Sequence, residues 1–387
     1  NAEAYQEEKF AGANERLTKT QLFTSRAMAI MPPFLTVLIS GISLAIYWVG
    51  AYLIDALPTA AERGDVYTQM ITFSSYAMQI IMAFMMLAMI FAILPRALVS
   101  LRRIGEVLNT EAKITDGTLT EAPEGSSVGT VEFRNVSFKY PDASEYVLHD
   151  MSFKAERGQT VAFIGSTGSG KSTAINLVPR FYDATEGEVL VDGVNVKDYT
   201  LAALHDKIGY VPQRAVMFSG TVESNVTYGE KAGLEYSEEG VKEAVRIAQG
   251  QEFVEEKEDG YKAHVAQGGT NFSGGQKQRL AIARAVYRRP EIYIFDDSFS
   301  ALDYKTDKQL RTALREETGG ATSLIVAQRI GTIRDADLIV VLDEGKVVGK
   351  GTHDELMQNC GVYREIAYSQ LSEEELAGMH GEVTVNE

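Results

Sequence analysis

The stretch Val161-Ala-Phe-Ile-Gly-Ser-Thr-Gly-Ser-Gly-Lys-Ser-Thr173 decides the fold of the second half of the chain. An apolar, β-branched run leads into a glycine-rich loop and then into a helical pattern that begins at Thr173. Strand, glycine loop and helix in this order form the phosphate-binding P-loop. Backbone N–H groups of the loop and the positive end of the helix dipole would surround the phosphates. The expected phosphate-binding residues are Gly165, Ser166, Thr167, Gly168, Ser169, Gly170, Lys171, Ser172 and Thr173.

A second motif fits the first. The run Glu291-Ile-Tyr-Ile-Phe-Asp296 is an apolar strand that ends in a carboxylate. Beside a P-loop, such a carboxylate holds the water shell of a magnesium ion. Lys171 is expected at the β and γ phosphates and Ser172 on the magnesium ion, with Asp296 acting through water. The sequence therefore predicts a site for ATP and Mg²⁺.

The third motif indicates a family. The run Asn271-Phe-Ser-Gly-Gly-Gln-Lys-Gln-Arg279 resembles the signature motif of ATP-binding cassette (ABC) proteins, with Phe272 where Leu is usual. The chain looks like an ABC exporter subunit with fused membrane and ATP-binding domains. That resemblance implies an α-helical transmembrane hairpin followed by an α/β P-loop cassette. The cassette should contain an antiparallel β portion, with a hairpin turn at Asp192-Gly193, and a helical subdomain that carries the signature.

The resemblance also assigns roles to single residues. Tyr140 matches the aromatic residue that stacks on adenine, and Gln213 matches the glutamine that contacts magnesium and water. Asp303 lies in the loop that crosses the dimer interface of the family. The signature residues serve a γ-phosphate bound by the opposing subunit, so they act in trans; they are Ser273, Gly274, Gly275 and Gln276.

Two positions depart from the family. Asp297 stands where hydrolytic members carry a Glu that orients the attacking water, and Gln328 stands where they carry a His beside the γ-phosphate. A carboxylate misplaced by about 1 Å can lower a rate on the order of 100-fold. An amide does not titrate near neutral pH as imidazole does. Together they predict a degenerate ATP site, as in one subunit of a heterodimeric multidrug exporter, with hydrolysis mainly at a site based on a non-identical half-transporter.

A membrane hairpin is expected from the first hundred residues. Residues 27–54 and 66–95 contain no Asp, Glu, Lys or Arg, and each run exceeds the roughly 20 residues that span a bilayer. The alternative is a buried helical hairpin of a water-soluble protein. Residues 62–65 are expected as the loop between the spans, and Pro32-Pro33 as a kink or restart of the first helix. Positive charges outside the spans place both ends in the cytoplasm; they are Lys19, Arg26, Arg96, Arg102 and Arg103.

Composition sets the remaining expectations. A formal net charge of −16 argues against a nucleic-acid partner, and the single cysteine, Cys360, excludes an intrachain disulfide. The expected segments are the C-terminal part of an exporter membrane domain, a linker, the nucleotide-binding domain and an acidic tail, at residues 1–112, 113–130, 131–371 and 372–387. The resemblance to exporters with six spanning helices implies that the first four would be absent from this chain.

The preferred function is ATP-driven export across a membrane, with the ATP-binding domain in the cytoplasm and a bacterial inner membrane as the expected location. The transported substrate stays open among drugs, lipids and peptides. Three alternatives remain: a homodimeric slow exporter, an ATP-gated channel or regulatory subunit, and a soluble ABC ATPase. The uncharged hairpin and the absence of basic tracts argue against the last of these.

Overall fold

The structure is a computed structural model that describes residues 3–141, 143–229, 231, 233–318 and 320–370. The chain divides into two compact units, Asn1–Glu111 and Ala112–Glu387. The acidic tail expected at residues 372–387 lies outside the described residues, so its structure stays a prediction.

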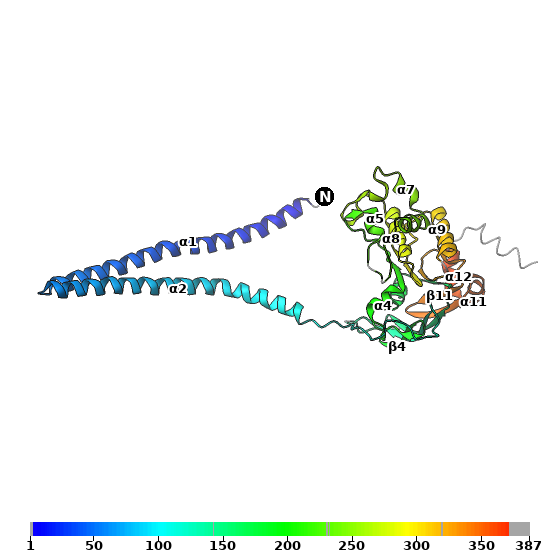
Figure 1. Ribbon diagram of the computed structural model, residues 1–387, viewed down its shortest axis with the longest axis horizontal. Helices are drawn as coiled ribbons and strands as arrows, with labels where there is room; N and C mark the ends of the chain where they lie inside the picture. Colours follow the sequence, from blue (N-terminus) through cyan, green and yellow to red (C-terminus); the bar gives the residue numbers. More distant parts are fainter. Residues whose placement is uncertain (1–2, 142, 230, 232, 319, 371–387) are drawn as a thin grey trace, which may run out of the picture. The chain divides into compact units, whose positions relative to one another are not determined.

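The first unit is a hairpin of two long helices, α1 (Glu3–Asp55) and α2 (Ala60–Leu108) (Figure 1). Each expected span lies inside one of these helices, and both are long and apolar enough to cross a membrane. Their apolar side chains are exposed; Trp48, for example, is 73% exposed. The helices approach closely at Gly50, where an added Cβ would lie 2.1 Å from the Met70 sulfur. Contiguous exposed apolar faces of this size are typical of surfaces that contact a membrane or another protein.

The expected position of the loop between the two spans is wrong. The turn falls at residues 56–59, and residues 62–65 belong to α2, because the Thr59 hydroxyl caps that helix by accepting a hydrogen bond from the Glu62 N–H. Arg63 Nε donates to the Leu57 carbonyl at 2.8 Å and closes the turn. In addition, α1 continues without a break through Pro32-Pro33, so the expected restart is absent. Prolines are tolerated in membrane helices, where neighbouring groups satisfy the freed carbonyls.

The second unit is built on a six-stranded sheet with the order β12-β11-β3-β10-β9-β6. Neighbouring strands are parallel, except that β12 runs antiparallel to β11. The strands are β3 (Thr160–Gly165), β6 (Ile208–Val211), β9 (Ile292–Asp296), β10 (Thr322–Val326), β11 (Leu338–Asp343) and β12 (Lys346–Gly351). The helices that connect or flank them are α3 (Lys171–Leu177), α4 (Leu201–Asp206), α9 (Tyr304–Glu317), α10 (Ile330–Ile333), α11 (His353–Asn359) and α12 (Gly361–Tyr368). The predicted α/β class is confirmed.

A second, antiparallel sheet has the order β2-β1-β4-β5. Its strands are β1 (Val131–Phe138), β2 (Leu148–Ala155), β4 (Glu186–Val191) and β5 (Val194–Asn195). Asp192 and Gly193 join β4 to β5 with φ values of 55° and 78°, as a type I′ turn requires. The hairpin predicted from these two residues is confirmed.

The helical part of the unit lies between β6 and β9 in the sequence. It contains α5 (Val222–Val226), α6 (Glu238–Ile247), α7 (Gln251–Glu255), α8 (Gly274–Tyr287), two short 3₁₀ turns (Gly260–Lys262 and Gln267–Gly269) and a small sheet of β7 (Gly220–Thr221) and β8 (His264–Val265). Phe272 is buried here, edge to face with Phe253 at 6.4 Å between ring centroids. The aromatic side chain that replaces the usual Leu is therefore a packing residue.

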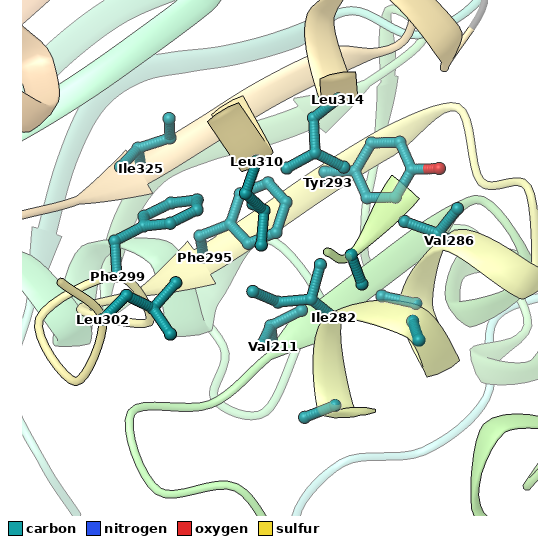
Figure 2. Close-up of a cluster of buried hydrophobic side chains, with 14 of the residues drawn as sticks. Val211, Ile282, Val286, Tyr293, Phe295, Phe299, Leu302, Leu310, Leu314 and Ile325 are labelled. Atoms are coloured by element: carbon teal, nitrogen blue, oxygen red, sulfur yellow. The ribbon is translucent and has the colours of Figure 1, made fainter. Parts of the chain in front are cut away.

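One continuous core holds the helical part against the sheet. Figure 2 shows side chains of β6, α8, β9, α9 and β10 packed together; they include Val211, Ile282, Phe295, Leu310 and Ile325. All five residues of β9 are buried, as expected for a central parallel strand. The carboxyl end of β9 is therefore a rigid base for the two aspartates that close it.

The segment expected as a linker, residues 113–130, is irregular but packs on the second unit. The Gly117 N–H donates to the Tyr199 carbonyl at 3.0 Å, and the Thr118 and Leu119 N–H groups both donate to the Asp198 carbonyl at 2.9 Å. An added Cβ at Gly117 would lie 2.2 Å from that same carbonyl oxygen. Glycine is needed at this position because two backbone segments approach each other closely, and not because the segment must be flexible.

Asp192 allows a test of this packing. Its Oδ1 accepts hydrogen bonds from the Gly129 and Thr130 N–H groups, and its Oδ2 lies 2.8 Å from Lys207 Nζ. Asp192→Ala removes the two backbone hydrogen bonds and one of the two carboxylate partners of Lys207, which keeps Glu291 at 2.9 Å, and should cost about 2–3 kcal/mol. We expect the melting temperature of the full chain in detergent to fall by about 5–10 °C.

Asp150→Ala is the matched control for that substitution. Asp150 also has a positive φ, of 46°, but its side chain is exposed. Both variants lose the tolerance of aspartate for this backbone conformation, and only one loses a buried ion pair. Equal falls in melting temperature would contradict the role assigned to the ion pair.

Candidate nucleotide-binding site

The glycine-rich loop joins β3 to α3, in the order predicted from the sequence. Two of its glycines are required because any side chain at these positions would clash with neighbouring atoms. An added Cβ would lie 2.0 Å from the Leu342 carbonyl oxygen at Gly165, and 2.7 Å from Leu148 Cδ2 at Gly170. Gly170 also has a φ of 94°, which L-residues with a side chain rarely adopt. The loop backbone can therefore take this path only with glycine at both positions.

Lys171 begins α3, and its side chain folds back over the loop. The ammonium donates to the carbonyl oxygens of Gly165 (2.9 Å) and Ser166 (2.7 Å) and to the hydroxyl of Ser169 (3.3 Å). Burial lowers the pKa of Lys171, while the charges of Asp297 and Asp296 act in the opposite direction. The loop oxygens hold a cation beside the backbone N–H groups, as required for binding a phosphate.

Asp296 lies at the carboxyl end of β9 and faces Ser172. The Ser172 hydroxyl donates to Asp296 Oδ1 at 2.7 Å, which brings together two residues 124 positions apart. The Tyr210 hydroxyl donates to Asn176 Oδ1 at 2.9 Å and lies 3.5 Å from Asp296 Oδ2. Burial raises the pKa of Asp296, and the hydrogen bonds from Ser172 and Tyr210 and the charge of Lys171 lower it. Sequence reasoning missed Tyr210, although it lies in β6, three residues before Gln213.

Asp297 and Gln328 contact each other directly. Gln328 Nε2 donates to Asp297 Oδ2 at 2.8 Å, and Gln213 Nε2 donates to the same oxygen at 3.1 Å. Burial raises the pKa of Asp297, and the Gln213 hydrogen bond lowers it. The backbone of Asp297 has a φ of 47°, and its carbonyl accepts from the Ser300 hydroxyl at 2.8 Å. The two departures from the family pattern thus form one hydrogen-bonded cluster with Gln213.

Tyr140 lies beside the loop. Its hydroxyl is 3.0 Å from the Thr173 hydroxyl, and its ring packs edge to face against Tyr182 at 5.1 Å and Phe138 at 5.0 Å. The ring is partly exposed, so one face can still receive a planar group. The position next to the helix start suits the expected stacking on adenine, which stays a prediction.

The signature residues begin α8. The Ser273 hydroxyl accepts from the Gln276 N–H at 3.3 Å, and the Gln276 side chain accepts from the Ser273 N–H at 3.0 Å, so they form a capping box. Ser273 and Gly274 are exposed. An added Cβ at Gly275 would lie 3.2 Å from the Ala301 carbonyl oxygen. The helix start is therefore presented to the outside of this unit and touches the 300–303 loop.

That loop is held at both ends. Asp303 caps α9, since its Oδ1 accepts from the Thr306 N–H at 3.0 Å. Arg329, which sequence reasoning did not single out, donates to the carbonyls of Ser300 (3.3 Å) and Leu302 (3.4 Å). Its position directly after Gln328 was the available signal. The 300–303 loop thus links the signature helix to the segment that carries Gln328.

The side-chain groups available as metal ligands at this site fit a magnesium ion. They are a hydroxyl, two carboxylates and an amide, which together supply the hard oxygen ligands that Mg²⁺ prefers. Within residues 3–370, gaps excepted, no group of three His, Cys, Asp or Glu side chains could hold a metal ion by itself. Mg²⁺ in nucleotide sites takes one or two carboxylates plus substrate phosphates, so this donor set matches a metal that arrives with its nucleotide.

Comparison with known proteins agrees with this geometry. Residues 148–300 match the ABC transporter family. The match lies within the second unit, and the proteins to which the chain is similar include ABC exporters.

The relatives are bacterial proteins that are longer than this chain. An uncharacterized ABC transporter ATP-binding protein of Mycobacterium tuberculosis is 45% identical over 95% of this chain and 62% of its own length. An ATP-dependent lipid A-core flippase of Pseudomonas fluorescens is 37% identical over 94% of this chain and 58% of its own length. The solved structure of a bacterial Atm1-family ABC exporter with ATP bound matches with a TM-score of 0.80 and 29% identity, covering 96% of this chain and 64% of that one. The chain spans about three fifths of the curated relatives it matches.

The contact between Ser172 and Asp296 can be tested. We predict that Ser172→Ala reduces the gain in ATP affinity that Mg²⁺ provides by about tenfold or more, because a first ligand of the metal is lost. ATP binding to the full chain is measured with Mg²⁺ and with a chelator. Ser144→Ala, the same change at an exposed position of the same unit, should leave that gain unaltered. An equal gain in Ser172→Ala and the parent would refute the assignment.

Proposed function

We propose that this chain is the ATP-binding subunit of an ABC exporter and that its own ATP site is degenerate. The residues proposed to hold ATP and Mg²⁺ are the glycine-rich loop with Lys171, Ser172, Gln213 and Asp296, and Tyr140 beside the adenine. Bound Mg²⁺ would supply positive charge against the phosphate oxygens. The cluster of Asp297 with Gln328 and Gln213 is the observation that carries the proposal.

The cluster favours holding ATP over cleaving it. Asp297 is one methylene shorter than the Glu of hydrolytic members, so its carboxylate lies farther from an attacking water. Two amide N–H groups already occupy one of its oxygens. Gln328, which would face the γ-phosphate, offers an amide that neither takes nor gives a proton near neutral pH. ATP bound here would then stabilise the closed state without rapid turnover.

The signature is proposed to act on a second subunit. Ser273, Gly274, Gly275 and Gln276 retain the family pattern and lie at an exposed helix start. A helix N-terminus with close backbone approach suits the γ-phosphate of a nucleotide held by the partner. An intact signature beside a degenerate site supports a non-identical partner that supplies the hydrolytic Glu and His. Hydrolysis at the partner-based site would reset the pair.

The hairpin of α1 and α2 is proposed to lie in a lipid bilayer, with the ATP-binding domain in the cytoplasm. The exposed apolar faces of both helices support this location, as do the positive charges that flank them. A bacterial inner membrane is consistent with the bacterial relatives. No described residue identifies the transported substrate. The name lipid A-core flippase belongs to a relative and is not transferred to this chain.

The asymmetric scheme predicts unequal effects of two substitutions. In the purified pair, Asp297→Ala should leave ATP turnover nearly unchanged, while replacing the partner's glutamate should lower it about 100-fold or more. Steady-state phosphate release in lipid nanodiscs measures both. Equal losses would contradict the scheme and would favour a homodimeric slow exporter. Ion conductance without substrate accumulation in vesicles would favour an ATP-gated channel.

A repaired variant tests the cause of the slow turnover. We expect Asp297→Glu combined with Gln328→His to raise the turnover of the self-paired chain by about tenfold or more, because a base of full reach and a titratable imidazole are restored. The same double variant carrying Lys171→Ala is the control and should remain inactive. Brisk turnover by the unmodified self-paired chain would contradict the degenerate site.

A further inference from the structure

The end of α12 contacts the segment that carries Gln328. The side chain of Gln370 makes two hydrogen bonds to that segment: its Oε1 accepts from the Ile330 N–H at 2.9 Å, and its Nε2 donates to the Gln328 carbonyl at 2.8 Å. One primary amide therefore pairs with the backbone on both sides of Arg329. This pairing resembles the one that a neighbouring strand would supply.

The Ile330 N–H needs such a partner. Ile330 is the first residue of α10, and the first N–H groups of a helix have no acceptor within it. The residue before it, Arg329, makes no side-chain cap. Ile330 itself is buried, with 1% of its surface exposed. Gln370 Oε1 thus performs the capping that no residue of α10 provides.

Gln370 is exposed and lies two residues beyond α12, a helix that is itself anchored in the core. Tyr363 and Ala367 of α12 are fully buried, and the Tyr363 hydroxyl lies 2.7 Å from His353 Nδ1 of α11. The Gln370 N–H continues the helix turn by donating to the Ala367 carbonyl at 3.1 Å. The amide therefore projects from a firmly packed helix end, and two hydrogen bonds from such a base restrain the loop.

The loop that receives these bonds is short. Only residues 327–329 separate β10 from α10, and at their start the Ala327 N–H donates to the Phe163 carbonyl at 3.2 Å. Gln328 and Arg329 are exposed, so core packing does not fix them. Holding the Gln328 carbonyl restrains the backbone from which its side chain projects, and the Nε2 of that side chain reaches Asp297. The Gln370 amide is thus a further anchor of the loop, in addition to the Ala327 N–H and to the Arg329 side chain, which donates to the Ser300 and Leu302 carbonyls.

We infer that Gln370 is a positioning residue of the nucleotide site, which holds the 327–329 loop so that Gln328 meets Asp297 and the γ-phosphate of ATP. This inference rests on the proposed function and deepens it. Gln370 itself touches neither the expected nucleotide nor Asp297. Its effect on binding passes through Gln328, and Gln328 would contact the γ-phosphate, which ADP lacks.

The test compares a non-hydrolysable ATP analogue with ADP on the full chain in nanodiscs, with Mg²⁺ present. Gln370→Ala should weaken binding of the analogue about three- to tenfold, which corresponds to the loss of one or two hydrogen bonds, and should leave ADP affinity unchanged. Gln370→Glu keeps the acceptor and loses the donor, so it should weaken the analogue too. Gln358→Ala, the same change at an exposed position of α11, should alter neither affinity.

A double substitution separates positioning from general stability. Gln328→Ala should weaken the analogue as Gln370→Ala does, and the combined variant should be no weaker than Gln328→Ala alone. Equal weakening of the analogue and ADP in Gln370→Ala, additive losses in the combined variant, or no loss at all would each overturn the inference. Failure of the unmodified chain to bind either nucleotide would overturn the proposed function as well. Normal binding by the parent with an unaffected Gln370→Ala would overturn the inference alone.

Discussion

Parallel pairing of β3, β10, β9 and β6 is the constraint on which the site depends. In this order β10 lies between β3 and β9, and β6 pairs with the far side of β9. Val326 pairs with Asp296 on one side and with Phe163 on the other, so neighbouring strands end at nearly the same level. Adjacent strands are about 4.8 Å apart, and the segments that follow them therefore emerge side by side at one edge. The glycine-rich loop, Gln213, Asp297 and Gln328 meet there, although more than 150 residues separate the glycine-rich loop from Gln328 along the chain.

The same edge concentrates negative charge. Asp296 and Asp297 are adjacent and each only 7% exposed, and burial raises the pKa of both carboxyl groups. The charge of Lys171 lowers the pKa of Asp296, and neutral donors supply the hydrogen bonds to the two carboxylates: Ser172, Tyr210, Gln213 and Gln328. Neutral donors satisfy oxygen atoms without cancelling their charge, so a bound cation would stabilise this edge. An amide at position 328 also donates at every pH, whereas an imidazole would change its donor pattern near neutrality.

Local patterns predicted the parts of the fold that depend on local physics. The β3 strand with its loop, the strand that ends at Asp296 and the Asp192-Gly193 hairpin were all readable from residue types and spacing. The contact between Asp297 and Gln328 was not, because it follows from which strands are neighbours. The predicted position of the turn between the two long helices was wrong because a run without charged residues indicates a lipid-facing stretch but does not indicate where a helix ends. Its signal was present in Thr59-Ala-Ala-Glu62, a capping pattern. Gln370 has no such signal, since only packing of α12 brings it to the loop.

The proposed division of the chain between a degenerate site and an intact signature would have a physical basis. The capping box of Ser273 with Gln276 and the packing of Phe272 on Phe253 are contained within the helical part of the unit. Asp297 and Gln328 belong to the sheet edge, outside the helical part. The two regions communicate where the 300–303 loop meets Gly275 on one side and Arg329 on the other. In the proposed scheme, a chain built this way would lose turnover at its own site and still present its signature to a partner, because the residues of the two regions lie on separate elements that are joined through this loop.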